Sequence, residues 1–350
     1  MNKTLIHGGD WAGYEERFHR PALDFSANIS PLGVPEGVKR AFLASADRLD
    51  RYPDPLCRRL REALSRREGI PPEQILCGSG GADLIFRAVQ AIRPKTALIT
   101  APAFGEYESA LRTVDCRVLC HILRQEEDFR LGEDFLGKIV PGLDLVFLCQ
   151  PNNPTGIAVP EDLLERILWR CREAGAAVVL DECFCDLMDQ PGDHRSLLGK
   201  IPGLILLRSM TKLYAIAGLR LGYCLCADRA LLDRMEELAQ PWSVSLPAQE
   251  AGAAALEEED YARRVQALIR EQRPVLKKGL EELGLRVIPG QANFLLFRCG
   301  RELTAPLAER GILVRSCGNY RGLDKSWYRI AVRTGEENRR LLAALREVLE

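Results

Sequence analysis

Two cations stand close together in one apolar stretch, "SMTKLYAIAGLRLGY" (residues 209–223). Lysine and arginine are seldom buried without a partner, so Lys212 and Arg220 need a reason to be there. A desolvated ammonium gives up its proton readily, which makes Lys212 a candidate Schiff-base lysine. Arg220 offers a planar fork suited to a phosphate, and the hydroxyls of Ser209 and Thr211 could bind the same phosphate. For either cation alone, a solvated surface loop is about as good an explanation.

A glycine-rich turn, "GSGGAD" (residues 78–83), follows the short apolar run "QILC" and leads into a predicted helix. Small residues such as Gly80 and Gly81 let backbone N–H groups approach a ligand closely, and the start of a helix favours an anion. The segment lacks the GxGxxG spacing of dinucleotide sites, which disfavours a nicotinamide dehydrogenase. It also lacks the Lys-Ser/Thr pair of a P-loop. It predicts either a phosphate-binding turn or an ordinary tight turn.

Two more polar segments follow apolar runs. The stiff turn "QPNNPTG" (residues 150–156) could hold the amide of Asn153 toward a ligand. Asp181 and Glu182 end the run "AAVVLDE", where a carboxylate is costly unless a cation or hydrogen-bond donors meet it. Asp181 could therefore face a protonated ring nitrogen of a cofactor. Turn chemistry alone would explain the first segment, and an exposed pair of acids remains an alternative for the second.

The elements that must position these residues are short apolar runs between residues 70 and 230. They are continuous rather than alternating, which is typical of strands buried on both faces. Helical patterns separate them, so we predict an α/β fold with a mostly parallel sheet covered by helices. Ligands of such sheets bind beyond the carboxyl ends of the strands, where the polar segments would lie. The candidate strands span residues 74–77, 96–100, 144–149, 176–182, 204–209 and 222–227.

The rest of the chain has a different character. Residues 257–284 form a long amphipathic helix candidate that Pro274 could disturb, and short apolar runs and two helices follow it. We predict a large α/β domain over residues 45–240. Residues 1–44 and 241–350 would form a smaller α+β domain that includes the N-terminal segment.

Composition excludes several classes of protein. The chain has 350 residues and a formal net charge of -1, so no global field attracts nucleic acid or an anionic membrane. No apolar run is long enough for a signal peptide or a bilayer span, and we expect a cytoplasmic protein. The 12 cysteines sit mostly in apolar runs without the paired CxxC spacing of zinc sites. We therefore expect reduced, buried thiols and no metal.

Taken in order, these segments resemble the fold-type I pyridoxal phosphate enzymes, the class I and II aminotransferase superfamily. The resemblance runs nearly end to end, from "DFSANISPLG" to "YRIAVRTGEEN", and the combination of "NNPTG", "DE" and "SMTKLYAIAGLRLGY" is highly specific. It implies the PLP-dependent transferase fold type I, with a mostly parallel, seven-stranded-type sheet in the large domain. It also implies pyridoxal phosphate as the cofactor.

The resemblance assigns roles to individual residues. It implies that Lys212 is the Schiff-base lysine, that Asp181 is the partner of the pyridinium nitrogen, and that both are catalytic. It places Asn153 at the phenolic oxygen of the cofactor and the ring of Phe104 against the pyridine. Its phosphate-binding positions are Gly80, Gly81, Ala82, Ser209 and Arg220.

Three further positions concern the neighbouring subunit and the substrate. Tyr52, in "RYPDP", matches a tyrosine that reaches the cofactor phosphate of a second subunit, which implies a homodimer. Arg329, in "WYRIAV", matches the arginine that binds the substrate α-carboxylate, where Asn153 is also near the substrate. Phe184 departs from the common pattern, because many aminotransferases have a tyrosine there whose hydroxyl bonds the phenolic oxygen.

Two subfamilies compete. The L-threonine O-3-phosphate decarboxylases of cobalamin biosynthesis are the more similar, through "HGG", "LDFSANISPLG", "PAFGEYESAL" and Phe184, and this likeness places His7 and Asn28 near the substrate. The histidinol-phosphate aminotransferases share "RYPD", "NNPTG" and the arginine near the C-terminus. We therefore expect decarboxylation of L-threonine O-3-phosphate to (R)-1-amino-2-propanol O-2-phosphate, with a histidinol-phosphate or related aminotransferase as the alternative. A PLP-fold protein that binds without turnover is a third possibility.

Several arginines near the C-terminus suit a phosphorylated amino-acid substrate, because bidentate arginines bind carboxylate and phosphate alike. The candidates are Arg315, Arg329 and Arg333, with Arg321 a candidate for a purely surface charge. If one strand continues through Arg333, Arg329 and Arg333 share a face, with Cα atoms about 13 Å apart. Residue chemistry alone leaves decarboxylation and transamination open, because the orientation of one bond separates them.

Overall fold

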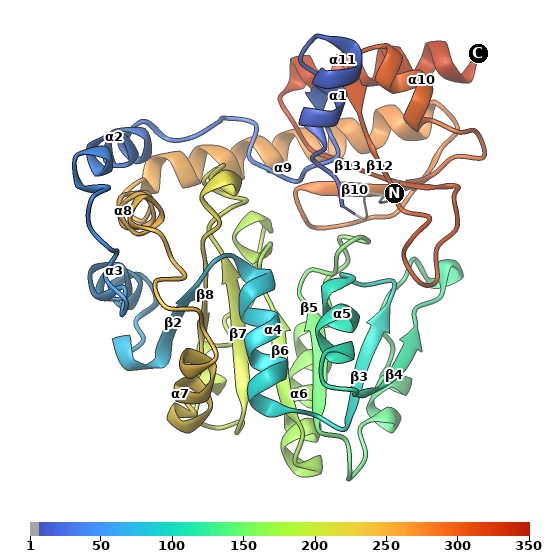
Figure 1. Cartoon of the computed structure of the whole chain (residues 1–350). Coiled ribbons are helices and arrows are strands. Elements are labelled where there is room, and N and C mark those ends of the chain that lie inside the picture. Colours follow the sequence, from blue (N-terminus) through green and yellow to red (C-terminus); the bar gives the residue numbers. More distant parts are fainter. Residues whose placement is uncertain (1–6) are drawn as a thin grey trace.

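The computed structural model describes residues 7–350, so the first six residues of the predicted N-terminal segment lie outside it. Its largest element is a seven-stranded sheet in the order β2-β8-β7-β6-β5-β3-β4 (Figure 1). β8 pairs antiparallel with both of its neighbours, and the other pairs are parallel, which confirms the predicted mostly parallel sheet. The strands are β2 (Ile75–Gly78), β3 (Thr96–Ala101), β4 (Arg117–Ile122), β5 (Leu145–Cys149), β6 (Ala177–Asp181), β7 (Leu204–Ser209) and β8 (Gly222–Leu225).

Helices cover both faces of this sheet. α4 (Gly81–Ile92), α5 (Glu106–Arg112) and α7 (Arg229–Glu237) share one core cluster, and α6 (Glu161–Ala174) belongs to another. Successive residues of β5 point into different clusters, Val146 into that of α6 and Phe147 into that of α4. Both faces of the strands are therefore buried, which explains why their sequences are continuously apolar.

A smaller antiparallel sheet lies above the large one, in the order β12-β13-β10-β9 (Figure 1). It packs with three helices around a third core cluster, namely α9 (Glu259–Glu282), α10 (Thr304–Glu309) and α11 (Gly335–Leu349). The strands of this sheet are β9 (Arg286–Val287), β10 (Phe294–Arg298), β12 (Arg315–Ser316) and β13 (Trp327–Ala331). The short strand β11 (Ile312–Leu313) lies outside it.

The N-terminal segment joins the smaller part of the molecule. β1 (Leu23–Asp24) pairs in parallel with β11, and Phe25 is buried in the third core cluster. α1 (Trp11–Phe18) is tied to the same region, because the hydroxyl of Tyr14 donates to the carbonyl of Ala308 at 3.1 Å. This arrangement brings residues just after α1 beside the C-terminal strands.

The remaining helices lie beside the edge of the large sheet and across its top (Figure 1). α2 (Glu36–Ala44), α3 (Arg58–Glu68) and α8 (Leu246–Ala255) pack together, and α9 (Glu259–Glu282) runs toward the small sheet. Pro274 lies inside α9 without ending it. Short 3-10 helices are η1 (Ser45–Arg48), η2 (Pro72–Gln74), η3 (Gln125–Glu127), η4 (Glu133–Lys138), η5 (Cys185–Leu187), η6 (Arg195–Leu197) and η7 (Ala217–Leu219). The domain boundaries proposed from the sequence stay a prediction.

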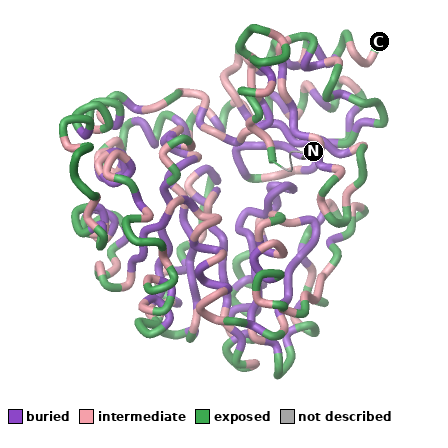
Figure 2. The backbone as a smooth tube through the Cα atoms, viewed as in Figure 1, coloured by how far each residue is buried: buried purple, intermediate pink, exposed green. Residues whose placement is uncertain are grey.

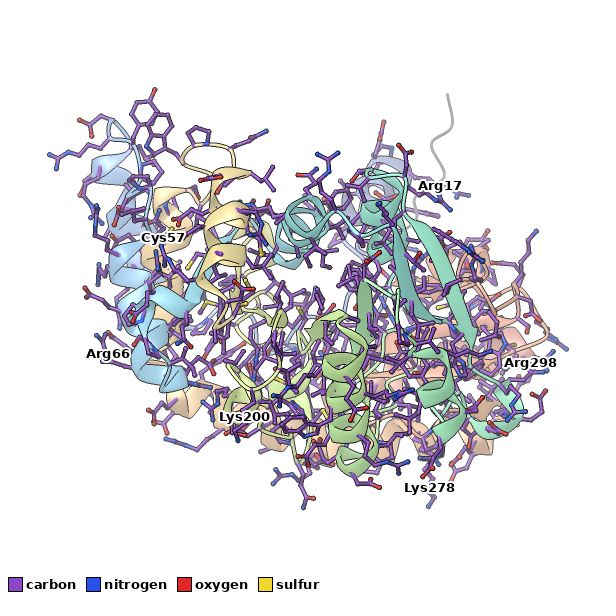
Figure 3. All side chains as sticks on the ribbon, turned by 90° about the horizontal axis from the view of Figure 1, so that it is seen from below. Arg17, Cys57, Arg66, Lys200, Lys278 and Arg298 are labelled. Carbon is purple, nitrogen blue, oxygen red and sulfur yellow. The ribbon has the colours of Figure 1, made fainter. Side chains whose placement is uncertain are left out.

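Burial follows the layers, with the central strands buried and the outer loops and helix faces exposed (Figure 2). Charged side chains such as Arg66 and Lys278 project from the rim (Figure 3). All 12 cysteines are free and most are buried, and the reduced state of their thiols stays a prediction. Within residues 7–350, no helix has the length and apolar character needed to cross a membrane.

Candidate active site

Two adjoining cavities lie at the carboxyl ends of the central strands. The inner cavity, of about 120 Å³, is lined by residues that follow β5, β6 and β7 and by the start of α4. The outer cavity, of about 380 Å³, lies between these residues and the small sheet. The two cavities share the lining residues Ala82, Phe104, Asn153, Phe184, Lys212 and Arg220. They therefore form one recess, at the position expected for ligands of a parallel sheet.

One end of the inner cavity is suited to an anion. Gly80 has φ +87°, a conformation that glycine adopts easily, and it caps the N-terminus of α4. A Cβ at Gly80 would lie 2.8 Å from Nη2 of Arg220, so the turn and this guanidinium are in direct contact. Gly81 and Ala82, in the first turn of α4, line the cavity wall. The helix N-terminus and Arg220 together make this end electropositive.

The hydroxyls of Ser209 and Thr211 complete this end. Ser209 is the last residue of β7, and its Oγ lies 2.7 Å from the Oγ1 of Thr211. Both residues line the inner cavity with Arg220. The structure thus brings together the predicted phosphate-binding positions. Gly80 contacts the guanidinium of Arg220 and does not itself line the cavity.

The inner cavity is also lined by one carboxylate. Asp181, the last residue of β6, is buried, and its Oδ2 accepts a hydrogen bond of 2.6 Å from the hydroxyl of Tyr107. Its Oδ1 accepts a bond of 3.0 Å from the backbone N–H of Cys183. Burial raises the pKa of Asp181, and the hydrogen bonds from Cys183 and Tyr107 oppose that rise.

Tyr107 and Cys183 were not predicted from the sequence as site residues. A signal for Tyr107 was present, because a buried tyrosine hydroxyl needs a partner and Tyr107 lies in the apolar face of a short helix in "PAFGEYESAL". Cys183 carries no such signal, because its contact depends on the turn that follows β6.

Lys212 shares the inner cavity with Asp181 and Arg220. Its side chain lines both cavities, and its Nζ lies 5.8 Å from the ring centroid of Phe184. Among residues 7–350, no hydrogen bond or ion pair to this Nζ is present. Burial lowers the pKa of Lys212, and the positive charges of Arg329 and Arg220 add to that effect. A larger fraction of this amine is therefore neutral, and nucleophilic, at neutral pH than of an exposed lysine.

Aromatic rings and one amide form the walls of the recess. Phe104 lines both cavities and meets Tyr107 edge to face at 5.8 Å. Phe184 is buried and meets Phe294 edge to face at 5.1 Å. Phe184 has no hydroxyl that could bind a ligand. The side-chain amide of Asn153 supplies the polar group of this wall.

Two arginines of the small sheet line the outer cavity. Arg315 of β12 and Arg329 of β13 are register partners, and both are buried. Arg329 donates to Oδ1 of Asn153 at 2.5 Å and to the carbonyl of Ser26 at 3.0 Å. Its buried Nε has no hydrogen-bond partner within the described part of the chain. Arg315 donates to Oδ1 of Asn319 at 2.8 Å.

The N-terminal segment closes another side of the outer cavity. The Nε2 of His7 lies 2.8 Å from Oε1 of Glu106, and its ring centroid lies 5.9 Å from that of Phe104. Asn28 is buried, and its Oδ1 has no hydrogen-bond partner among residues 7–350. Both residues line the outer cavity, as their predicted substrate contacts require.

Arg333 is not brought into the recess. β13 ends at Ala331, so the condition that would place Arg329 and Arg333 on one strand face is not met. The guanidinium of Arg333 donates to Oε1 of Glu337 at 2.8 Å and to the carbonyl of Asp24 at 3.1 Å. It lines neither cavity, and its contacts tie α11 to β1.

Arg321 and Tyr52 also lie outside the recess of their own chain, as their predicted roles at the surface and at a second subunit require. Arg321 is exposed and forms an ion pair of 2.8 Å with Glu108. Tyr52 is 77% exposed and stacks on Trp242 at 4.3 Å, so it lines neither cavity of its own chain.

Comparison with known proteins decides the family. The family model for aminotransferase class I and II matches residues 20–345. The chain belongs to the aminotransferase class I and II family. This membership confirms the predicted transferase fold type I and the prediction that the chain is an enzyme.

Members of the aminotransferase class I and II family with different reactions are similar to this chain. Threonine-phosphate decarboxylase of Salmonella typhimurium is 42% identical over 93% of the chain and 91% of that protein. Histidinol-phosphate aminotransferase 1 of Cupriavidus pinatubonensis is 32% identical over 94% of the chain and 88% of that protein. The crystal structure of the histidinol-phosphate aminotransferase from Clostridium acetobutylicum superposes with a TM-score of 0.87 at 26% identity, covering 93% of this chain and 99% of that one.

Proposed function

We propose that this chain binds pyridoxal phosphate and decarboxylates L-threonine O-3-phosphate to (R)-1-amino-2-propanol O-2-phosphate, a step of cobalamin biosynthesis in the cytoplasm. The observation that carries the proposal is the 42% identity with a threonine-phosphate decarboxylase, against 32% with the histidinol-phosphate aminotransferase of similar coverage. The presence of phenylalanine at position 184, where many aminotransferases have tyrosine, favours the same choice.

The inner cavity fits pyridoxal phosphate on chemical grounds. The N-terminus of α4, Arg220 and the hydroxyls of Ser209 and Thr211 are suited to its phosphate. Asp181, in the lining of the same cavity, is suited to a protonated ring nitrogen. Lys212 presents an amine without a protein partner in the described residues, as covalent attachment to an aldehyde requires.

The outer cavity suits a small substrate with two anionic groups. Its lining includes the cations Arg315, Arg329 and Arg220, and Glu106 is the carboxylate near them. The unpartnered Nε of Arg329 and the unpartnered Oδ1 of Asn28 are buried polar atoms that a bound substrate could satisfy. We assign Arg329 to the substrate carboxylate.

Bound pyridoxal phosphate would supply a ring that accepts the electron pair left at the α-carbon when a bond there breaks. In the proposed reaction, the bond from the α-carbon to the carboxylate breaks, carbon dioxide leaves, and a proton goes to the α-carbon. Lys212 can deliver that proton, because it lines both cavities and its amine has no hydrogen-bond partner in the described residues, whereas Asp181 is engaged by Tyr107 and Cys183. The outer cavity selects the bond by orienting the carboxylate and the phosphate.

A histidinol-phosphate aminotransferase is the alternative, since relatives with that name cover nearly the whole chain. The test is to compare kcat/KM and products for O-phospho-L-threonine, O-phospho-L-serine and histidinol phosphate. We expect O-phospho-L-threonine to be the best substrate, with carbon dioxide and aminopropanol phosphate as products. Faster turnover of histidinol phosphate with a 2-oxo acid as amino acceptor would replace the proposal with the alternative.

We propose a homodimer in which Tyr52 reaches the cofactor phosphate of the second subunit. A supporting observation is the exposure of Leu43, Tyr52 and Trp242, which are 67%, 77% and 46% exposed. An apolar groove of about 410 Å³ lies between α2 and residues 215–219, next to Arg220. Such surfaces are unfavourable in a monomer and typical of an interface.

A further inference from the structure

We propose that Tyr107 and Cys183 are positioning residues that hold the Asp181 carboxylate ionised and in one orientation toward the cofactor ring nitrogen. The inference rests on the proposed cofactor but not on the proposed substrate. Tyr107 lines neither cavity, so it can act only through Asp181, whereas Cys183 lines the inner cavity and acts on Asp181 through its backbone N–H.

The contacts of Asp181 engage both of its oxygens. Oδ2 accepts from the hydroxyl of Tyr107 at 2.6 Å, and Oδ1 accepts from the backbone N–H of Cys183 at 3.0 Å. A carboxylate held at both oxygens cannot rotate freely about its terminal bond, so its orientation toward the inner cavity is fixed.

Tyr107 is itself held rigidly. It is 1% exposed, and its ring stacks on Phe147 of β5 with centroids 4.8 Å apart and planes 13° apart. Phe104, three residues earlier, meets the Tyr107 ring edge to face and lines the inner cavity. One short segment therefore supplies both an aromatic wall of the cavity and the donor to Asp181.

The two donors also oppose a cost of burial. Desolvation favours the neutral carboxyl and raises the pKa of Asp181, whereas hydrogen bonds from Tyr107 and Cys183 favour the carboxylate. A carboxyl group that became neutral or turned away would lose its ion pair with a protonated ring nitrogen. The affinity for the cofactor should therefore depend on both donors. This dependence should disappear for a cofactor that has no ring nitrogen to pair with Asp181.

This dependence can be tested with two forms of the cofactor. Pyridoxal phosphate and an analogue with carbon in place of the ring nitrogen are titrated into apo wild type and Tyr107→Phe. We expect Tyr107→Phe to raise the dissociation constant of pyridoxal phosphate about tenfold, the scale of one charge-assisted hydrogen bond. We expect no change for the analogue, which has no ring nitrogen for Asp181 to meet.

Tyr328→Phe is the matched control, because Tyr328 is also buried and hydrogen-bonded but lines neither cavity. It should leave both dissociation constants unchanged.

An equal loss for both cofactors in Tyr107→Phe would mean a general packing role and would overturn the inference, as would no loss for either. Because no substrate is present, these outcomes are separate from the proposed decarboxylation. A wild type that binds pyridoxal phosphate but releases no carbon dioxide would contradict only the proposed function.

Discussion

At the scale of single residues, Arg329 is the side chain on which substrate binding depends most. It is buried, and its guanidinium donates hydrogen bonds to Asn153 and to the Ser26 carbonyl. The central carbon of the guanidinium lies 5.4 Å from the ring centroid of Phe294. These contacts fix the plane of the guanidinium before substrate arrives. A preoriented fork of this kind recognises a carboxylate better than a flexible ammonium does.

We therefore predict that Arg329→Lys lowers kcat/KM for O-phospho-L-threonine by roughly 100-fold, because lysine keeps the charge and loses the bidentate geometry. Arg333→Lys is the matched control and should change kcat/KM by less than about threefold, since Arg333 faces Glu337 outside the recess. Steady-state kinetics on both variants give the answer. Equal losses would return Arg333 to the substrate site.

At the scale of elements, a buried ionic cluster joins the ends of two central strands. Glu182 follows Asp181 at the end of β6, and Arg208 precedes Ser209 in β7. Their Oε2 and Nη2 atoms are 3.0 Å apart. His194 contacts the other oxygen of Glu182 at 2.5 Å and Glu161 of α6 at 2.8 Å. The cluster holds the strand ends that carry Asp181 and Ser209 at a fixed separation.

This cluster predicts a pH dependence of stability. Burial lowers the pKa of His194, but the hydrogen bonds and charges of Glu182 and Glu161 outweigh it and leave the pKa raised above 6.5. A raised pKa in the folded state contributes stability that is fully present below about pH 6.5 and is lost as the pH rises through the folded value.

Thermal unfolding of wild type and His194→Gln between pH 6 and 9 tests this dependence. We expect the substitution to cost about 2 kcal/mol at pH 6 and progressively less at higher pH, because the wild type loses the charged interaction there. Exposed Lys200→Gln should parallel the wild type at every pH. A constant difference between wild type and His194→Gln would show that the histidine does not titrate in this range.

The sequence predicted the elements that are marked by a pattern of neighbouring residues, and it missed the features that depend on residues far apart in the chain. Continuous apolar runs marked the buried strands, and the cofactor-site motifs follow them in the chain. β4 was missed because it is the edge strand, where the polar side chains of Arg117 and His121 interrupt the apolar pattern. The contact of Tyr107 with Asp181 joins residues 74 positions apart, a pairing that no local pattern contains. The end of β13 at Ala331 likewise could not be read from spacing, and it moved Arg333 out of the site.

At the scale of the whole molecule, the recess is built from three distant parts of the chain. The N-terminal segment supplies His7 and Asn28, the large sheet supplies Asp181 and Lys212, and the small sheet supplies Arg329. The proposed dimer would add a fourth contribution, from Tyr52 of a second copy.

Mixing two inactive variants tests that contribution. We predict that Lys212→Ala and Tyr52→Ala chains, unfolded and refolded together, regain activity, because a mixed dimer has one site with both residues intact. If Tyr52 serves its own chain, every mixed dimer lacks a complete site and no activity returns. Each variant refolded alone is the control, and decarboxylation rate is the readout.

The proposed bond cleavage is tested most directly by following the carboxyl carbon of the substrate. O-phospho-L-threonine labelled with ¹³C at the carboxylate is incubated with the holoenzyme, and the label is followed by nuclear magnetic resonance. The account predicts that the label moves into carbon dioxide and bicarbonate while unlabelled aminopropanol phosphate accumulates, and that Lys212→Ala abolishes both signals. Label retained in a 2-oxo acid would contradict the account and identify an aminotransferase.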